Sequence, residues 1–493
     1  MDAAINREQF GEHEYERMRD RLEQCLMALD VLLSRPDFGV GPQTLGAELE
    51  LFLIDRHAAP MPHNDRVHGR IDDERVTKEV NRYNVEANLT PVPLEGAPFG
   101  AMRDEMDELQ AMVDAAAQGD GRSISIGTLP TLTTEDLGAA AVTEEARYKA
   151  LDHRLRVLRN EPYRIDIAGD DHLVAEANDV SLEGANTSFQ LHVRVEPRRF
   201  VDVYNAAQIA TAPVLAVSGN SPFFLGHRLW HETRIALFKQ SVDFRDGHRL
   251  RTVPSRVSFG GRWLERSAME IFADAVRTHE PLLPVMSDED PRAAVHVGMV
   301  PGLDELRMHL GSIWTWNRAV YDPDAGGHLR VELRALPAGP TTLDMAANAA
   351  FLLGLTLAVS DDTATWTRLL AFEQARANFV AAARDGLDAT MLSPFDRSGV
   401  QHVGARELAL RLLEPARDAL CSRHVEDDDV DHLFELLDER ITTGRTGATW
   451  QRAAVDALEP RLGRERALVA MTERYVDAMS TGAPVHTWPR PAA

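Results

Sequence analysis

The sequence predicts an α+β fold in which helices flank a sheet with one apolar and one polar face. Four segments alternate apolar and polar residues with the period of a β-strand. Helical patterns precede these segments and lie between them. From about residue 342 onward the pattern is helical almost throughout. Strands followed by a run of helices are typical of the α+β class.

The first predicted strand is "GAELELFLI" at 46–54, and it carries two carboxylates within an apolar run. Alternate side chains of a strand share a face, so the leucines point to a core while Glu48 and Glu50 stand together on the other side. Their Cα atoms would lie roughly 7 Å apart. Two such carboxylates repel each other unless a cation neutralises them, and their spacing lets them converge on a divalent cation. In isolation the pattern also fits an amphipathic strand with a solvated face.

Three later segments have the same design. They are "NVEANLTPV" at 84–92, "NTSFQLHVRVE" at 186–196 and "HLRVELRAL" at 328–336. Their polar sides carry Glu86, then Gln190, His192 and Arg194, then Arg330, Glu332 and Arg334. A solvated antiparallel sheet face would explain any one of them. Surface strands usually carry Thr, Ser, Lys and mixed charges, whereas these faces are rich in Glu, His and Arg.

Helices are predicted around these strands. Periodic apolar residues indicate helices at 7–35, 99–118, 201–217, 231–241 and 345–359. The last of these is too short to span a bilayer and reads as a buried helix, so we expect no transmembrane segment.

Composition restricts the class of function. A formal net charge of -24 argues against nucleic acid as a partner, because phosphate binding needs a basic field. Only three lysines occur, Lys78, Lys149 and Lys239, so nearly all positive charge is Arg. The two cysteines, Cys25 and Cys421, form neither a disulfide framework nor a metal-ligand spacing. The charged N-terminus lacks the apolar core of a signal peptide, and we therefore expect a cytoplasmic protein without membrane contacts.

The polar strand faces indicate chemistry on phosphate. Glu and His side chains ligate Mg²⁺ or Mn²⁺, and guanidinium groups neutralise charge on a transferring phosphoryl group. The common nucleotide-binding signatures G-x-x-x-x-G-K-[ST] and G-x-G-x-x-G are absent from the sequence, as are H-E-x-x-H and G-x-S-x-G. If ATP binds, metals and the sheet must hold its phosphates.

Five motifs, in this order along the chain, resemble those of one family. "GAELELFLI" looks like a Gly-x-Glu-x-Glu strand, "NVEANLTPVPL" like a Glu-x-Asn-x-x-Pro strand and "QLHVRV" like a histidine strand. "AVSGNSPFFLG" is similar to an Ala-x-Ser-x-Asn-Ser-Pro-x-x-x-Gly loop, and "VELR" to a Glu-x-Arg strand. The family is the carboxylate-amine ligases of the glutamine synthetase superfamily, of the glutamate-cysteine ligase type.

The resemblance covers about residues 40–375. It implies a glutamine-synthetase-like antiparallel sheet, or half-barrel, with flanking helices. It also implies a catalytic domain at 1–375 followed by a helical region at 376–493. The implied reaction uses ATP and Mg²⁺ or Mn²⁺ to convert a carboxylate, here the γ-carboxyl of glutamate, into an acyl phosphate. An amine such as cysteine then attacks, as in the synthesis of glutathione-type thiols.

The resemblance also implies roles for residues. The expected metal ligands are Glu48, Glu50, Glu86, His192 and Glu332. Arg334 is expected to stabilise the transferring phosphoryl group, with Glu48 and Glu332 completing the catalytic set. We assign the nucleotide to Gln190, Arg194 and Arg330, and the substrate to Arg234, Asn220 and Ser221.

Two positions depart from the family pattern. Arg194 stands where many relatives have a second histidine, and Leu129 of "GTLP" where they have a histidine turn. Arg194 would supply a permanent cation for phosphate. These departures leave the amine acceptor open.

Other functions remain open at this stage. The same carboxylates would serve a metal-dependent phosphotransferase or hydrolase, and a non-catalytic relative would bind nucleotide or amino acid only. The sequence also leaves a homo-oligomer open.

Overall fold

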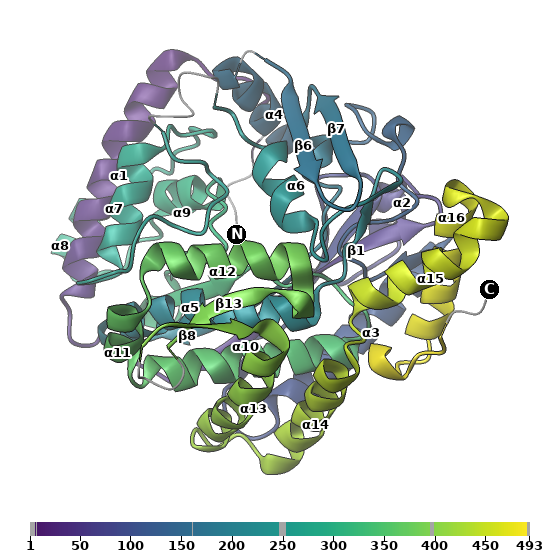
Figure 1. The fold of residues 1–493 in the computed structure, drawn as a ribbon. Coiled ribbons are helices and arrows are strands. Elements are labelled where there is room, and N and C mark those ends of the chain that lie inside the picture. The colour runs from purple at the N-terminus through teal and green to yellow at the C-terminus, as the bar shows by residue number, and fades with distance from the viewer. Residues whose placement is uncertain (1–4, 6, 160, 246–252, 395–398, 491–493) are drawn as a thin grey trace.

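The centre of the protein is an open antiparallel sheet (Figure 1). The computed structural model describes residues 5, 7–159, 161–245, 253–394 and 399–490. The strand order is β11-β12-β8-β1-β3-β2, and β4 and β5 also pair with β1. The strands of this sheet are β1 (Thr44–Ile54), β2 (Val76–Lys78), β3 (Asn84–Asn88), β4 (Val92–Pro93), β5 (Arg122–Ile124), β8 (Phe189–Val195), β11 (Asn317–Asp322) and β12 (His328–Leu333). Every pairing is antiparallel, which confirms the predicted α+β class with an antiparallel sheet.

Three small two-stranded sheets lie outside this centre in the described part of the chain. They pair β6 (Tyr163–Ala168) with β7 (His172–Ala177), β9 (Phe223–Phe224) with β10 (His227–Arg228), and β13 (Thr390–Ser393) with β14 (Gln401–Gly404).

Helices cover the apolar face of the central sheet. α3 contacts β1 and β3, α5 contacts β11 and β12, and α10 packs on both helices from behind. α13 and α14 lie outside α10, and α15 and α16 pair with each other near the C-terminus (Figure 1). The described helices are α1 (Glu12–Leu33), α2 (Asn64–His68), α3 (Pro98–Ala117), α4 (Ala146–Arg159), α5 (Phe200–Ser218), α6 (Arg234–Ser241), α7 (Met269–Thr278), α8 (Pro291–His296), α9 (Asp304–Gly311), α10 (Thr342–Ser360), α11 (Thr363–Leu369), α12 (Phe372–Asp385), α13 (Ala405–Cys421), α14 (Asp427–Thr443), α15 (Gly447–Leu462) and α16 (Arg464–Met479).

The two central helices α5 and α10 are almost entirely apolar. By length and composition, the spans Pro197–Ser218 and Thr342–Ser360 would suffice to cross a membrane, but 89% of an apolar 18-residue stretch within each span is buried inside the fold. A helix that is hydrophobic all round belongs in the interior of a large protein. Both helices therefore serve as core helices between the sheet and the outer helices.

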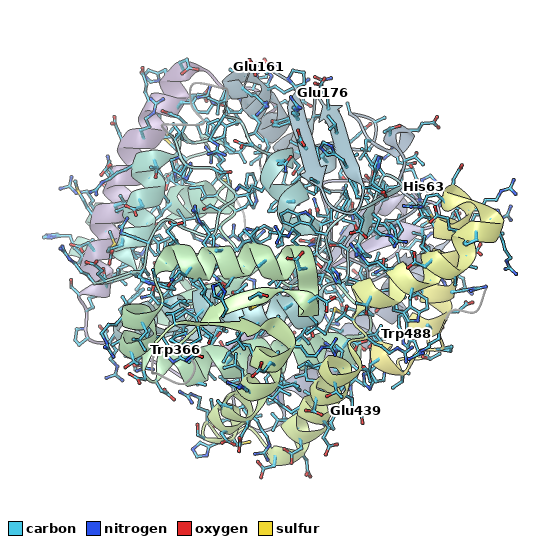
Figure 2. All side chains as sticks on the ribbon, viewed as in Figure 1. His63, Glu161, Glu176, Trp366, Glu439 and Trp488 are labelled. Carbon is cyan, nitrogen blue, oxygen red and sulfur yellow. The ribbon has the colours of Figure 1, made fainter. Side chains whose placement is uncertain are left out.

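The helical C-terminal part packs onto the rest of the chain. The expected boundary between residues 375 and 376 falls inside α12, and two hydrophobic clusters each contain residues from both sides of it. Trp488, labelled in Figure 2, makes edge-to-face contacts with Trp450 of α15 and Tyr475 of α16, at 5.1 Å between ring centroids in each case. The hydroxyl of Tyr475 donates to the carbonyl of Ser125 just after β5, at 2.8 Å.

A buried ion pair joins α10 to α14. Asp344 and Arg440 are 0% and 1% exposed at the side chain, and Nη2 of Arg440 lies 2.8 Å from Oδ1 of Asp344. Asp344 also accepts a hydrogen bond from the backbone N–H of Val485 at 3.0 Å. The pair thus holds the C-terminal segment against the core helix.

Asp344→Ala is expected to lower the free energy of unfolding by about 3–5 kcal/mol, because it leaves a buried guanidinium without its counter-ion. Denaturant unfolding followed by circular dichroism measures this. Asp431→Ala is the matched control, because Asp431 forms a partly exposed pair with Arg417 at 2.6 Å and its loss should cost less than about 1 kcal/mol. Equal losses in the two variants would contradict the expectation.

The buried histidine His309 of α9 makes stability depend on pH. It is 1% exposed, and its Nε2–H donates to the carbonyl of Ala275 at 3.1 Å. Burial, followed by the charge of Arg256, lowers the pKa of His309 from 6.5 to about 4. Between these pH values the unfolded chain binds a proton that the folded chain excludes, so the free energy of unfolding falls as the pH falls.

His309→Gln should remove this contribution while the amide keeps a donor for Ala275. We expect the loss of stability between pH 7 and pH 5 to be smaller by about 2 kcal/mol than in the unmodified protein. Denaturant titrations at the two pH values measure it. His432→Gln, at an exposed position on α14, should leave the pH dependence unchanged.

Candidate active site

The polar face of the sheet is built around β1. Leu49, Leu51 and Leu53 are 0% exposed on one side of this strand, and Glu48 and Glu50 are partly exposed on the other. The predicted alternation is therefore present, because successive side chains of a strand point to opposite faces.

Strand register brings the other polar residues beside these two. Glu50 lies opposite Glu86 on β3, and Glu48 lies opposite Gln190 on β8. His192 of β8 lies opposite Glu332 of β12. Residues directly opposite in an antiparallel pair share a face, so one surface collects the residues of four strands.

Glu48, His192 and Glu332 form the tightest group on this surface. One candidate ligand atom of each lies within 4.8 Å of the others. His192 Nε2 is 2.9 Å from Oε1 of Glu48 and 4.0 Å from Oε1 of Glu332. Burial would raise the pKa of Glu48, but the charge of His192 and its hydrogen bond outweigh burial and hold that pKa below its ordinary value.

This donor set fits a divalent cation. Two carboxylates and an imidazole are ligands that suit Mg²⁺ or Mn²⁺. Nε2 of His192 is the imidazole nitrogen that faces both carboxylates.

Two arginines neutralise Glu332, which is 0% exposed at the side chain. Arg334 Nη1 lies 2.6 Å from Oε1 of Glu332, and Arg318 Nη2 donates to the same oxygen at 2.9 Å. Burial would raise the pKa of Glu332, but the charges of Arg318 and then Arg334 hold it well below its usual range. Arg334 also donates to Oε1 of Gln190, so its guanidinium is fixed over the middle of the sheet.

A second group of carboxylates surrounds Glu50. Glu50 accepts hydrogen bonds from the backbone N–H of Ser188 at 2.7 Å and from Nε2 of Gln190 at 3.0 Å. Burial and then the charge of Glu79 raise the pKa of Glu50 to about 7. Burial and the charges of Glu48, Glu79 and Glu50 raise the pKa of Glu86 well above its ordinary value. Carboxylates crowded in this way attract a cation.

Four residues near this group were missed by the sequence reasoning. Burial and the charges of Glu79 and Glu50 raise the pKa of Glu183 well above its ordinary value. Glu79 directly follows β2. The charge of Arg147 on α4 acts to lower the pKa of Glu79, and the charge of Glu79 acts to raise the pKa of the neighbouring Tyr148. None of these residues lies in a segment with strand-like alternation, so no sequence pattern pointed to them.

The nucleotide candidates Arg194 and Arg330 lie opposite each other on β8 and β12, two residues beyond the pair His192 and Glu332. They are on the side away from Arg334. Arg330 pairs with Asp322 at 3.2 Å, and Arg194 donates to the carbonyl of Val40 at 3.0 Å. The third nucleotide candidate, Gln190, lies instead between Glu50 and Arg334.

The substrate candidates divide into two groups. Arg234 begins α6, is 4% exposed at the side chain, and pairs with Glu232 at 3.1 Å. Its charge acts on the pKa of Glu50, so it borders the second carboxylate group. It packs against Gly127, where an added Cβ would lie 2.9 Å from Cδ of Arg234.

Asn220 and Ser221 do not join the polar face. Both are 0% exposed. The amide of Asn220 donates to the carbonyl of Ala338 and to the hydroxyl of Tyr475, at 2.8 and 2.9 Å. Oγ of Ser221 accepts a bond from the backbone N–H of Arg234 at 3.3 Å. In these positions they support the loop that carries Arg234.

Leu129, one of the two departures from the family pattern, is 0% exposed in a hydrophobic cluster. It therefore presents no polar group to the sheet face.

Known proteins share this fold. A model of glutamate-cysteine ligase family 2 (GCS2) matches residues 44–470. The structure of glutamate-cysteine ligase from Francisella tularensis in complex with AMP is similar over 90% of this chain and 89% of that chain, with 12% identity and a TM-score of 0.52. At this identity the likeness shows a shared fold.

Two further solved structures are more distant. A bifunctional glutathione synthetase from Pasteurella multocida matches 93% of this chain and 54% of its own, with 11% identity and a TM-score of 0.48. The complex of the prokaryotic ubiquitin-like protein Pup with its ligase PafA matches 87% and 72%, with 9% identity and a TM-score of 0.36. No curated protein sequence matches the chain.

The family match, the shared fold and the carboxylate-lined sheet face together define a carboxylate-amine ligase. The chain belongs to glutamate-cysteine ligase family 2, since the family model covers most of its length.

Proposed function

We propose that the protein is an ATP- and Mg²⁺-dependent ligase that activates the γ-carboxyl of a glutamate-like acid and joins it to an amine. The observation that carries the proposal is the group of Glu48, His192 and Glu332 within 4.8 Å, with Arg334 beside it. Membership of the family and the AMP bound to the similar F. tularensis enzyme support it.

The reaction has two steps. An oxygen of the substrate carboxylate attacks the γ-phosphorus of ATP, so that a C–O–P linkage forms and ADP leaves. The amine nitrogen then forms a bond to the carbonyl carbon, the C–O bond to phosphate breaks with its electron pair going to phosphate, and the amine loses a proton. The products are an amide, ADP and phosphate.

The chain's own residues divide this work. Glu48, His192 and Glu332 would hold one divalent cation, and Glu50 with Glu86 would hold a second. Bound cations would neutralise negative charge on the phosphates of ATP. Arg334 points a fixed guanidinium at the middle of the sheet, where it stabilises negative charge on the transferring phosphoryl group.

The substrates lie along the same face. Arg194 and Arg330 bind the nucleotide phosphates at one end of it. Arg234 offers a guanidinium to the carboxylates of the acid substrate at the other end.

The test is ADP release by the purified protein with ATP, Mg²⁺, glutamate and a panel of amines. We expect ADP formation that requires both glutamate and an amine. Phosphate release without any amine requirement would favour a hydrolase or phosphotransferase, and nucleotide binding without turnover would favour a non-catalytic relative.

A further inference from the structure

A large cavity lies at the β11 edge of the sheet and shares Arg318 with the site described above. Its volume is about 1060 Å³, and its walls come mainly from α6, α7, α12, β11, the segment just before β11 and residues 254–264 between α6 and α7. Sites for small molecules occupy roughly 300–1,000 Å³, so this cavity is at the upper end of that range. A free amino acid would leave most of it empty.

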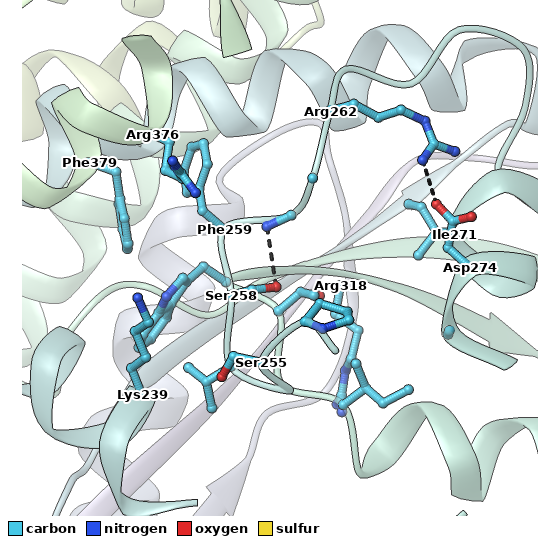
Figure 3. Close-up of a pocket in the computed structure, with 18 of the residues that line it drawn as sticks. Lys239, Ser255, Ser258, Phe259, Arg262, Ile271, Asp274, Arg318, Arg376 and Phe379 are labelled. Atoms are coloured by element: carbon cyan, nitrogen blue, oxygen red, sulfur yellow. Dashed lines mark hydrogen bonds and ion pairs between the residues drawn. The ribbon is translucent and has the colours of Figure 1, made fainter. Parts of the chain in front are cut away.

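Aromatic rings form one wall. Phe259 and Phe379 stack with their ring centroids 5.0 Å apart, and Trp316 lies 5.7 Å from Phe379. Figure 3 shows Phe259 and Phe379 on the same side of the view as Arg376, and Ser258 and Arg318 line the same cavity. Such a wall suits a flat ring or an apolar body.

The lining carries six lysine and arginine side chains against two acidic ones. Five of the six are arginines that already pair with carboxylates: Arg245 with Asp243, Arg262 with Asp274, Arg318 with Glu332, Arg376 with Glu373 and Arg384 with Asp385. Lys239 forms no ion pair with any residue in the described ranges, and Figure 3 shows it on the same side of the cavity as Arg376. Lys239 is therefore the group of the lining that is best placed to attract an anion.

The cavity adjoins the reacting centre on the side of Arg318 and Arg334. Arg318 lines it and contacts Glu332, and the carbonyl of Trp316 accepts a hydrogen bond from the backbone N–H of Arg334 at 2.9 Å. α6, which begins with Arg234, contributes Ile235 and Lys239 to the wall.

Along β8 and β12, Arg194 and Arg330 lie on the side of Glu332 that is away from Arg334. The cavity adjoins Glu332 and Arg334 on the other side, through Arg318 and Trp316. An acceptor held there would reach the carbonyl carbon of the acyl phosphate without crossing the nucleotide phosphates.

We propose that this cavity holds the amine acceptor, and that the acceptor is a molecule larger than a free amino acid, with a flat or apolar body and at least one anionic group. The inference rests on the proposed ligase function, because it assigns the second substrate of that reaction. Free cysteine lacks both the size and the ring for this space.

The binding test uses 8-anilinonaphthalene-1-sulfonate, an aromatic anion whose fluorescence rises in apolar sites. We expect Lys239→Glu to weaken its binding about tenfold, because the variant places a like charge beside the sulfonate. Lys149→Glu makes the same charge change at an exposed lysine on α4 and should leave binding unchanged. Val380→Trp, at an exposed residue of the wall, should weaken binding by filling the cavity.

Two results of this test would overturn the proposal. Equal binding in Lys239→Glu and Lys149→Glu would show that the cavity does not hold the anion. Competitive displacement of the dye by MgATP would assign the cavity to the nucleotide.

The kinetic test compares cysteine with the dipeptide phenylalanyl-glutamate, which joins a free amine to an aromatic ring and two carboxylates. We expect a higher kcat/KM for the dipeptide than for cysteine. Lys239→Glu, unlike the control Lys149→Glu, should lower the kcat/KM for the dipeptide about tenfold. A preference for cysteine that Lys239→Glu does not change would overturn the inference and leave the ligase function standing. Dye binding without ADP formation for any amine would overturn the ligase function itself.

Discussion

Glu48→Gln is expected to lower kcat by at least about 100-fold while the protein remains folded. Glutamine keeps the shape of the side chain and an oxygen that accepts the hydrogen bond from His192 Nε2. It removes the negative charge that draws a divalent cation to Glu48, His192 and Glu332. Turnover is measured as amine-dependent ADP release, and the fold is followed by circular dichroism.

A direct measurement of metal binding separates this explanation from a structural one. In a calorimetric Mn²⁺ titration, Glu48→Gln should bind at least about tenfold more weakly than the unmodified protein. Glu435→Gln, at an exposed position on α14, is the matched control and should change neither value. Full turnover or unchanged Mn²⁺ affinity in Glu48→Gln would show that Glu48 is not a metal ligand.

The polar residues of this sheet face could be predicted from the sequence, because the alternation of side chains along a strand is a local property. Alternation alone placed Glu48 and Glu50, and likewise His192 and Glu332, on the polar sides of their strands. Their convergence depended on register, which pairs His192 with Glu332 across β8 and β12. Register is set by turns and by packing of the whole sheet, so a single sequence reveals it only through resemblance.

Other members of the site escaped prediction for physical reasons. Arg318 lies on β11, a strand of only six residues where Ala319 and Tyr321 alternate with Arg318 and Asp322. That weak alternation was the signal available for Arg318. Glu79 and Glu183 lie outside regular strands, so only tertiary folding brings them beside Glu50.

The same limit applies to the loop "SGNSPFFLG". Its match to a family motif suggested substrate contacts for Asn220 and Ser221, but a motif does not tell whether its polar groups serve a ligand or the fold. Here the amide of Asn220 is held by Ala338, Tyr475 and Gln451, all within the core. Buried polar groups need such partners, and here they come from outside the loop that positions Arg234.

Arg334→Lys is expected to lower kcat by about 100- to 1000-fold with a smaller change in the KM for ATP. The guanidinium contacts Oε1 of Glu332 at 2.6 Å and Oε1 of Gln190 at the same time. Both bonds come from Nη1, so a lysine ammonium keeps the charge that neutralises Glu332 and the fold should persist, but it lacks the remaining planar N–H groups of the guanidinium. Because the negative charge of a phosphoryl group spreads over several oxygens during transfer, a misplaced point charge stabilises it less.

Steady-state kinetics at saturating glutamate and amine separate kcat from KM, and thermal unfolding checks the fold. Arg103→Lys makes the same exchange at a partly exposed arginine of α3 that pairs with its neighbour Asp104, and it should leave kcat unchanged. A kcat for Arg334→Lys within a few-fold of the unmodified protein would mean that the charge at this position suffices. In that case the directed hydrogen bonds of Arg334 would serve to hold Glu332 and Gln190 in place, and the group that stabilises the transferring phosphoryl would have to be sought at Arg318, the other guanidinium on Glu332.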